Sequence, residues 1–211
     1  MIIAAVILFI ALYSGLSDEP YRVLDTHTLP TDSFRVIDKP RDFVLDASIA
    51  KLGNQTFVID NHDKSSGLVN ISYSGDPEKF INCGNVTSHV KEAGGQRDYD
   101  FPGAKAQMKY DIMNGNTLLH IDRKMSLEAH VSLDFMEINP NQTKVTANTL
   151  YVVRKDVTST NANTAFHQSW SDIVSFKTRG SAPFGNEVSS AATTSCVATG
   201  ELEREVLSAV E

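Results

Sequence analysis

The sequence feature that most restricts the fold is a strict two-residue alternation from Ser126 to Phe135. Apolar side chains occupy one set of alternate positions, and polar side chains occupy the other. Because successive side chains of a β-strand point to opposite faces, this pattern predicts a strand with one buried face and one face in water. The predicted buried set is Leu127, Ala129, Val131, Leu133 and Phe135. We therefore expect the chain to fold around an antiparallel sheet.

Turn signals on both sides of this strand predict its neighbours. Alternating residues over 108–112 lead to Asn114–Gly115, a dipeptide typical of tight hairpins. Asn139–Pro140–Asn141 is expected to turn the chain into a partner strand over 145–153. An earlier hairpin is expected over 56–73.

Three polar stretches predict loops rather than strands. The segment 84–103 is interpreted as a long loop with one short strand, and 157–169 as a mobile hairpin tip. A strand over 173–176 and a flexible stretch over 180–194 are expected to follow.

Two segments have helical spacing. After Pro40, the side chains of Leu45, Ile49 and Leu52 lie on one helical face, and Gly53 is expected to end that helix in a left-handed conformation. A final helix is expected after Thr199, with Leu202, Val206 and Val210 buried. Its charged residues, Glu203 among them, are expected to face water.

These elements predict an α+β fold in which one antiparallel β-sheet packs against two helices, a helix-grip-like arrangement. The 211 residues suffice for one ordinary domain, which we place at 40–211. Residues 17–39 contain two prolines and little periodicity, and they are interpreted as an extended tether.

The N-terminal segment predicts export. Every side chain from Met1 to Leu12 is apolar. This run is shorter than the roughly twenty apolar residues that a membrane-spanning helix needs. We interpret residues 1–16 as a signal peptide or membrane anchor, and a buried N-terminal strand or helix is the alternative. A bacterial lipoprotein would carry its lipid on a Cys after Gly15, and this chain has Leu16 there.

Cysteine usage agrees with export. The chain has two cysteines, Cys83 and Cys196, and neither belongs to a CxxC pair. In an exported protein such a pair is expected to form one disulfide, although two buried thiols are the alternative.

Charge and motifs exclude several functions more clearly than they indicate one. The formal net charge is −7, which argues against a nucleic-acid partner and against unaided binding to an anionic membrane. No nucleophile elbow, P-loop or dinucleotide-binding glycine motif is present, so we expect neither an enzyme nor a cofactor.

Two short runs deserve comparison with metal sites. His120 and Asp122 would share one face of a strand, but a histidine beside a carboxylate is more often a solvated surface pair. The run Asp60–Asp63 has oxygen ligands without the spacing of a calcium loop, and it is interpreted as a turn. We therefore assign no catalytic, cofactor-binding or metal residue.

Three stretches carry a resemblance to a known group of proteins. They are Tyr73–Pro77 with Ile81–Gly84, the strand Thr143–Thr146, and Cys196–Glu203. In these the chain resembles uncharacterised envelope lipoproteins of Gram-negative bacteria. Its layout is also similar to the helix-grip domains of the outer-membrane assembly lipoproteins called BamC. The resemblance implies a location in the periplasm or at the periplasmic face of the outer membrane.

These observations predict a non-enzymatic periplasmic or outer-membrane-associated protein that acts as an interaction or assembly module. It would associate with a membrane through residues 1–16 and bind an envelope protein. The alternative is a carrier of a small apolar ligand or lipid, held in a cavity between sheet and helix.

Overall fold

The fold is mostly β, and the α+β helix-grip prediction is wrong. A computed structural model describes residues 21–23, 33–54, 56–92, 95–187 and 193–210. Strands make up 62% of the structure and helices 12%, and the strands form three sheets. The prediction failed because long polar stretches that were interpreted as loops are strands.

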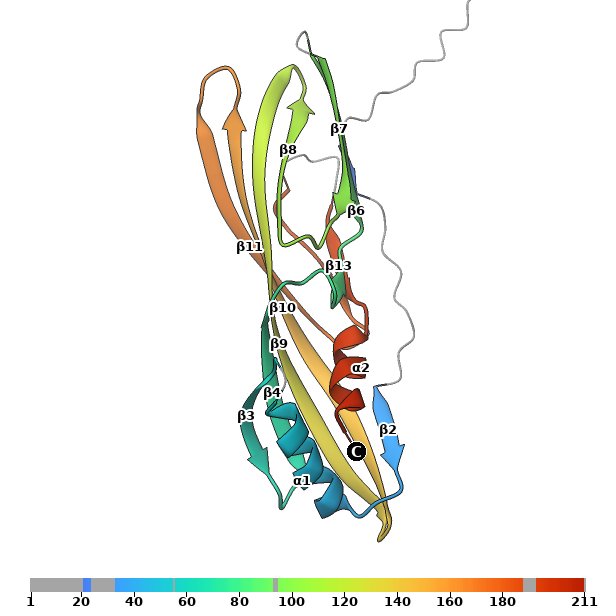
Figure 1. Ribbon diagram of the computed structural model, residues 1–211. Helices are drawn as coiled ribbons and strands as arrows, with labels where there is room; N and C mark the ends of the chain where they lie inside the picture. Colours follow the sequence, from blue (N-terminus) through green and yellow to red (C-terminus); the bar gives the residue numbers. More distant parts are fainter. Residues whose placement is uncertain (1–20, 24–32, 55, 93–94, 188–192, 211) are drawn as a thin grey trace, which may run out of the picture.

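A long hairpin runs the length of the molecule (Figure 1). Strand β9 (Thr117–Asn139) pairs with β10 (Gln142–Asn161) in antiparallel register, and the predicted turn at Pro140–Asn141 joins them. The alternation over 126–135 is confirmed, because its apolar side chains are buried and the residues between them face outward. At a rise of about 3.4 Å per residue, β9 alone extends over roughly 75 Å.

The lower half of this hairpin is widened on both sides. Strand β4 (Leu68–Gly75) pairs with β9, and β3 (Val58–Asp63) pairs with β4. On the other side β2 (Phe34–Ile37) pairs with β10. The inner face of this half forms the lower core, which includes Leu133, Phe135, Val145, Tyr151 and Leu202.

Two helices cover the lower core. Helix α1 (Arg41–Leu52) buries Leu45 and Leu52, whereas Gly53 has a right-handed φ of −64°, so the left-handed prediction is wrong. Helix α2 (Glu201–Ser208) buries Leu202 and Val206 as predicted. The prediction for Glu203 is wrong, because this carboxylate is fully buried.

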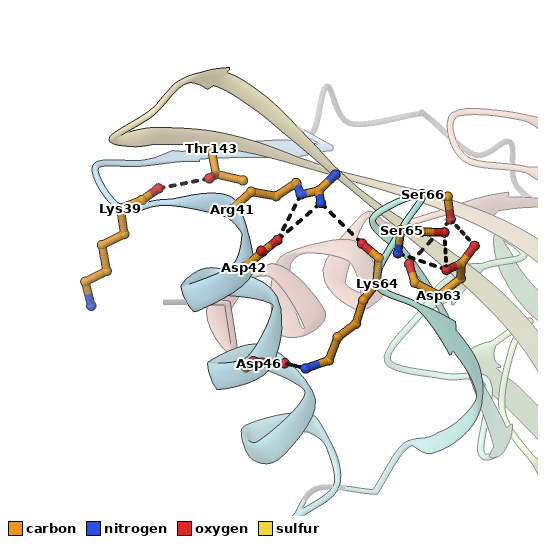
Figure 2. A network of polar contacts seen from close by, with 9 residues as sticks. All are labelled: Lys39, Arg41, Asp42, Asp46, Asp63, Lys64, Ser65, Ser66 and Thr143. Atoms are coloured by element: carbon orange, nitrogen blue, oxygen red, sulfur yellow. Dashed lines mark hydrogen bonds and ion pairs between the residues drawn. The ribbon is translucent and has the colours of Figure 1, made fainter.

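Polar contacts fasten α1 to the β3–β4 turn (Figure 2). Arg41 donates to the backbone carbonyl of Lys64, and the Lys64 ammonium lies 2.5 Å from Asp46. Asp63 accepts hydrogen bonds from Ser65 and Ser66, which lower the pKa of its carboxyl below the usual value. The turn interpretation of Asp60–Asp63 is wrong, because the whole run lies in β3 and the turn begins at Lys64.

The upper half of the hairpin has different neighbours. Strand β8 (Gln107–Asn114) pairs with β9 through a tight turn at Gly115–Asn116, one residue later than the Asn114–Gly115 prediction. Strand β11 (His167–Lys177) pairs with β10. A second sheet of β1 (Tyr21–Val23), β6 (Asn85–Glu92) and β7 (Gly95–Pro102) packs beside β8.

This half has its own apolar interior, the upper core. Its buried members are Val86, Phe101, Tyr110, Ile112, Ile121 and Val157. The loop prediction for 84–103 is wrong, because β6 and β7 fill that segment. The hairpin tip predicted over 157–169 is present but shorter, because β10 extends to Asn161 and β11 begins at His167. Each of these strands has a polar outer face, so their apolar residues are too sparse to stand out in the sequence.

A small sheet and a disulfide contribute to the lower core. Strands β12 (Ser181–Pro183), β13 (Ser195–Ala198) and β5 (Ile81–Asn82) form this sheet. The predicted bond between Cys83 and Cys196 is present, and both residues are fully buried. It fixes the start of the β6–β7 hairpin to the segment that leads into α2.

The predicted tether contains two paired strands, since β1 and β2 both fall within 17–39. The predicted signal or anchor segment, residues 1–16, lies outside the described residues. Neither described helix combines the length and the apolar character that crossing a bilayer requires.

Candidate functional site

The upper half of the sheet carries a polar pocket on its outer face. Its volume is about 460 Å³, and residues from β7, β8, β9 and β10 line it. We call it the Asp111 pocket. Its polar lining consists of Tyr99, Lys109, Asp111, His120, Asp122, Thr158 and Thr160, with Tyr110 and Ile121 beside them.

Strand register brings these side chains together. Asp111 of β8 lies directly opposite His120 of β9, and His120 lies opposite Thr160 of β10. A second cross-strand row lies two residues away along each strand and consists of Lys109, Asp122 and Thr158. Directly opposed residues of an antiparallel pair share a face, so both rows point into the same pocket.

Asp111 is the most buried carboxylate of the pocket, with 11% of its side chain exposed. Its Oδ1 lies 2.6 Å from His120 Nδ1, and its Oδ2 accepts a 3.0 Å hydrogen bond from the Tyr99 hydroxyl. Arg97 Nε is 3.1 Å from the same Oδ2. Burial and the neighbouring Asp111 carboxylate raise the pKa of Tyr99 above its usual value.

Asp122 is only partly satisfied. Its Oδ2 lies 3.2 Å from the ammonium of Lys109. Its Oδ1 is buried and has no hydrogen-bond partner among the described residues. A buried acceptor without a partner costs free energy of the order of 1–3 kcal/mol.

Both carboxylates of the pocket have a cationic partner. Asp122 pairs with Lys109, and Asp111 pairs with Arg97, which lies beside the lining residues and also contacts Glu92. The His120 imidazole adds a further contact to Asp111 through its Nδ1. The charged side chains of the pocket are therefore already engaged with one another.

The sequence indicated only part of this site. His120 and Asp122 share a face as predicted, but they contact Asp111 and Lys109 respectively rather than a common centre. Among the described residues, no group of three or more His, Cys, Asp or Glu side chains has an arrangement suited to a metal ion. The hairpin turn at Gly115 was the signal that could have placed Asp111 opposite His120, because it sets the register of β8 on β9.

A second set of buried charges lies between the two cores. The ammonium of Lys155 is 2.9 Å from Glu187, donates to the backbone carbonyl of Asn186 and lies 4.4 Å from the centre of the Phe184 ring. Burial lowers the pKa of Lys155 below its usual value. All of these contacts join β10 to the segment that follows β12. We therefore assign Lys155 a structural role.

The lower end of the sheet exposes apolar side chains on its outer face. Val36 and Met136 lie on either side of Lys144 in the strand register, and the Lys144 ammonium is 4.7 Å from the centre of the Phe34 ring. Ile138 follows on the same face of β9. We call these four apolar residues (Phe34, Val36, Met136 and Ile138) the tip patch, and each has 45–51% of its surface exposed.

Comparisons with known proteins identify no relative of this chain. No protein-family model, no curated protein and no solved structure matches it.

Proposed function

We propose that this protein is a non-enzymatic interaction or assembly module of the cell envelope, associated with the outer membrane and facing the periplasm. Residues 1–16 would serve as its signal or anchor, and an envelope protein would be its partner. The tip patch is the observation that carries this proposal, because it gathers four exposed apolar side chains around Lys144 in a protein whose cores are already buried.

The disulfide supports the compartment. Structural disulfides persist in oxidising compartments such as the periplasm and are rare in the reducing cytosol. The bond between Cys83 and Cys196 is fully buried and joins two parts of the chain that are 113 residues apart.

The position of the tip patch supports an interaction away from the N-terminal segment. Strand β1 lies in the upper half, with Tyr21 opposite Ser88 of β6. Ser88 contacts β8 at Asp111, which is level with His120 of β9. From His120 to Met136 the strand extends over roughly 50 Å, at about 3.3 Å per residue. A protein held at residues 1–16 would therefore present the tip patch at its far end.

The carrier alternative has less support. Leu202 and Val206 of α2 and Tyr151 of β10 are all fully buried, so side chains occupy the contact between this helix and the sheet. We therefore prefer the interaction module.

The test is site-specific photocrosslinking in the native envelope. A photoreactive amino acid at Met136 should crosslink one defined protein, and Val36→Glu in the same chain should abolish that product, because an acidic side chain would replace an apolar contact. The matched control is Ile173→Glu, which alters an exposed apolar residue on β11, outside the tip patch. Crosslinking that is unchanged by Val36→Glu, or absent altogether, would contradict the proposal.

Export is tested separately by the intact mass of the protein produced with its own N-terminus. We expect a mass that lacks the first residues or an envelope-bound full-length chain, with both cysteines protected from alkylation until reduction. A full-length protein in the cytosol with two freely alkylated thiols would exclude the proposed location.

A further inference from the structure

Strand β11 (His167–Lys177) has one edge that no described strand covers. It pairs with β10 on one side and ends the strand order of its sheet on the other, and Figure 1 shows it at the border of the upper half, on the side away from β7. We propose that this edge pairs with the same edge of a second copy of the chain, so that two β11 strands join their sheets in antiparallel register. The inference does not depend on the proposed function, because the tip patch lies outside β11.

The hydrogen bonds of the β10–β11 hairpin show which backbone groups of β11 face the free edge. Beyond the two ends of β11, Asn161 donates to the carbonyl of Phe166, and Thr178 donates to the carbonyl of Thr149. Hydrogen-bonded pairs alternate along an antiparallel ladder, and this ladder has no register shift, so the even-numbered residues of β11 bond to β10. The odd-numbered residues over 169–175 therefore direct their N–H and C=O groups outward. Among the described residues, none of these groups has a backbone partner.

This edge lacks the features that protect other edges. Natural sheets discourage edge pairing with bulges, prolines and charged side chains. Strand β3 has a register shift and two aspartates, and β7 has three charged residues and a proline. Over 169–175, β11 has neither a bulge nor a proline. Its one charged residue there, Asp172, accepts hydrogen bonds from the Gly185 and Asn186 amides and shares the inner face with the buried Phe176.

A second copy fits the edge because the outward-facing residues are symmetric about Ile173. A two-fold axis at Ile173 places this residue opposite itself and places Ser171 opposite Ser175 of the partner subunit. Residues that form a hydrogen-bonded antiparallel pair exchange both of their backbone hydrogen bonds. The outward N–H and C=O groups of all three residues would therefore be satisfied in the dimer.

Side-chain chemistry favours this axis over its neighbours. Ile173 has 56% of its surface exposed in the single chain, and contact with its own copy would remove apolar surface from water. An axis at Asp172 would oppose two carboxylates, which is destabilising, whereas the Ile173 axis places Asp172 opposite Val174. An axis at Ser171 would place Ile173 opposite Ser169 and lose the apolar contact.

The first test is sedimentation equilibrium of the protein with its natural N-terminus, over a range of concentrations. A contact made by one strand edge belongs to the smallest class of interfaces, so we expect a dissociation constant of about 1–100 μM. The net charge of each chain is −7, so the buffer should contain about 0.15 M salt, which screens charge repulsion beyond about 8 Å.

Two variants block the edge in different ways. Ile173→Glu places two carboxylates at the axis, and Ser175→Pro removes an N–H that faces outward and makes no bond to β10. Each should raise the dissociation constant by at least about tenfold, and the urea midpoint checks that each variant folds. The matched control is Val36→Glu, which makes the same exchange at an exposed apolar residue outside β11. It should dimerise as the parent protein does.

Disulfide formation between copies tests the register. Both native cysteines belong to the buried Cys83–Cys196 bond, so an added cysteine provides the reactive thiol. Opposed residues of a hydrogen-bonded pair have Cα atoms about 5.5 Å apart, which a disulfide can span. A mixture of Ser171→Cys and Ser175→Cys chains should therefore oxidise to a mixed dimer. Either variant alone should not, because its two cysteines would lie more than about 13 Å apart.

Three results would overturn the inference. The first is a chain that stays monomeric at every concentration, even if its edge accepts a strand of another protein. The second is dimerisation that Ile173→Glu and Ser175→Pro both leave unchanged, and the third is oxidation of Ser171→Cys chains without the other variant. The proposed function fails separately, because Val36→Glu should abolish only the tip-patch crosslink and Ile173→Glu should weaken only the dimer.

Discussion

The hydroxyl of Tyr151 on β10 donates a 2.7 Å hydrogen bond to Glu203 on α2, and both side chains are fully buried. The second oxygen of Glu203 accepts a 2.8 Å hydrogen bond from Thr178. Helix α2 is therefore positioned by a satisfied polar group within an otherwise apolar contact. Removal of one partner should cost more than the loss of an exposed hydrogen bond, because the other partner stays buried.

We expect Tyr151→Phe to lower the free energy of unfolding by about 1–3 kcal/mol, because Glu203 loses one of its two donors. Urea unfolding at neutral pH measures this change. Tyr99→Phe is an informative comparison, since its hydroxyl also bonds a carboxylate but at a partly exposed site. A Tyr151→Phe protein as stable as the parent would show that Glu203 finds another donor.

The same pair predicts a loss of stability at alkaline pH. Burial, and then the charge of Glu203, raise the pKa of Tyr151 above its usual value of 10. The folded state therefore keeps the phenol proton more strongly than the unfolded state does. Its contribution to stability is fully present below pH about 10 and declines as pH rises further. In Tyr151→Phe, urea midpoints measured between pH about 8 and about 11 should decline less steeply than in the parent.

Gly67, in the β3–β4 turn, lies close to the backbone of Phe135. It has a φ of +71°, and a Cβ atom there would lie 2.6 Å from the carbonyl oxygen of Phe135. We expect Gly67→Ala to destabilise the protein by more than about 2 kcal/mol, because strain and a backbone clash add. Gly115→Ala is the control, with a φ of +59° and no atom near the added Cβ, and it should cost only about 1 kcal/mol. Equal unfolding midpoints for the two variants would contradict this.

Local sequence patterns predicted the central strand β9 but failed to predict strands β6 and β7. The strand over 126–135 was predictable because one of its faces is wholly apolar and the other wholly polar. Strands β6 and β7 were missed because polar residues dominate them, and their few buried side chains, such as Val86 and Phe101, pack against β8 of another sheet. Burial of Glu203 was equally hidden, because its donors are Tyr151 on β10 and Thr178 in the turn after β11, both distant from α2 in sequence.

For the candidate site, the sequence placed His120 and Asp122 on one face but could not supply their partners. Those partners depend on strand register, and register depends on the exact residues of the turn. The Tyr99 contact depends in addition on how a second sheet packs beside β8. The disulfide was easier, because two cysteines in an exported chain allow only one intramolecular pairing.

Reduction of the disulfide should destabilise the protein strongly. The bond closes a loop across a sequence separation of 113 residues, for which the chain-entropy relation gives about 5 kcal/mol. Cys83→Ala combined with Cys196→Ala should lower the unfolding free energy by a similar amount, measured in urea. The parent protein treated with a reductant during unfolding provides the comparison. Unchanged midpoints in both cases would show that the unfolded chain already holds these segments together.

The buried pair of Lys155 and Glu187 predicts a non-additive response to mutation. Glu187→Gln keeps an acceptor for the Thr194 amide but removes the charge that faces the Lys155 ammonium at 2.9 Å. An uncompensated buried charge costs about 3–5 kcal/mol, so this variant should be markedly destabilised. Lys155→Met in addition removes the stranded charge and should recover most of the loss.

A double-mutant cycle in urea measures this coupling between Lys155 and Glu187. The control is the exposed pair of Arg154 and Asp156, which flank Lys155 in β10 and lie on the opposite face of that strand. Asp156→Asn there should change the unfolding free energy by no more than about 1 kcal/mol, because water screens exposed charges. If Glu187→Gln were as mild as Asp156→Asn, the Lys155 ammonium would have to be satisfied by Asn186 and Phe184 alone. The joint between the upper and lower cores would then depend on those two contacts rather than on the ion pair.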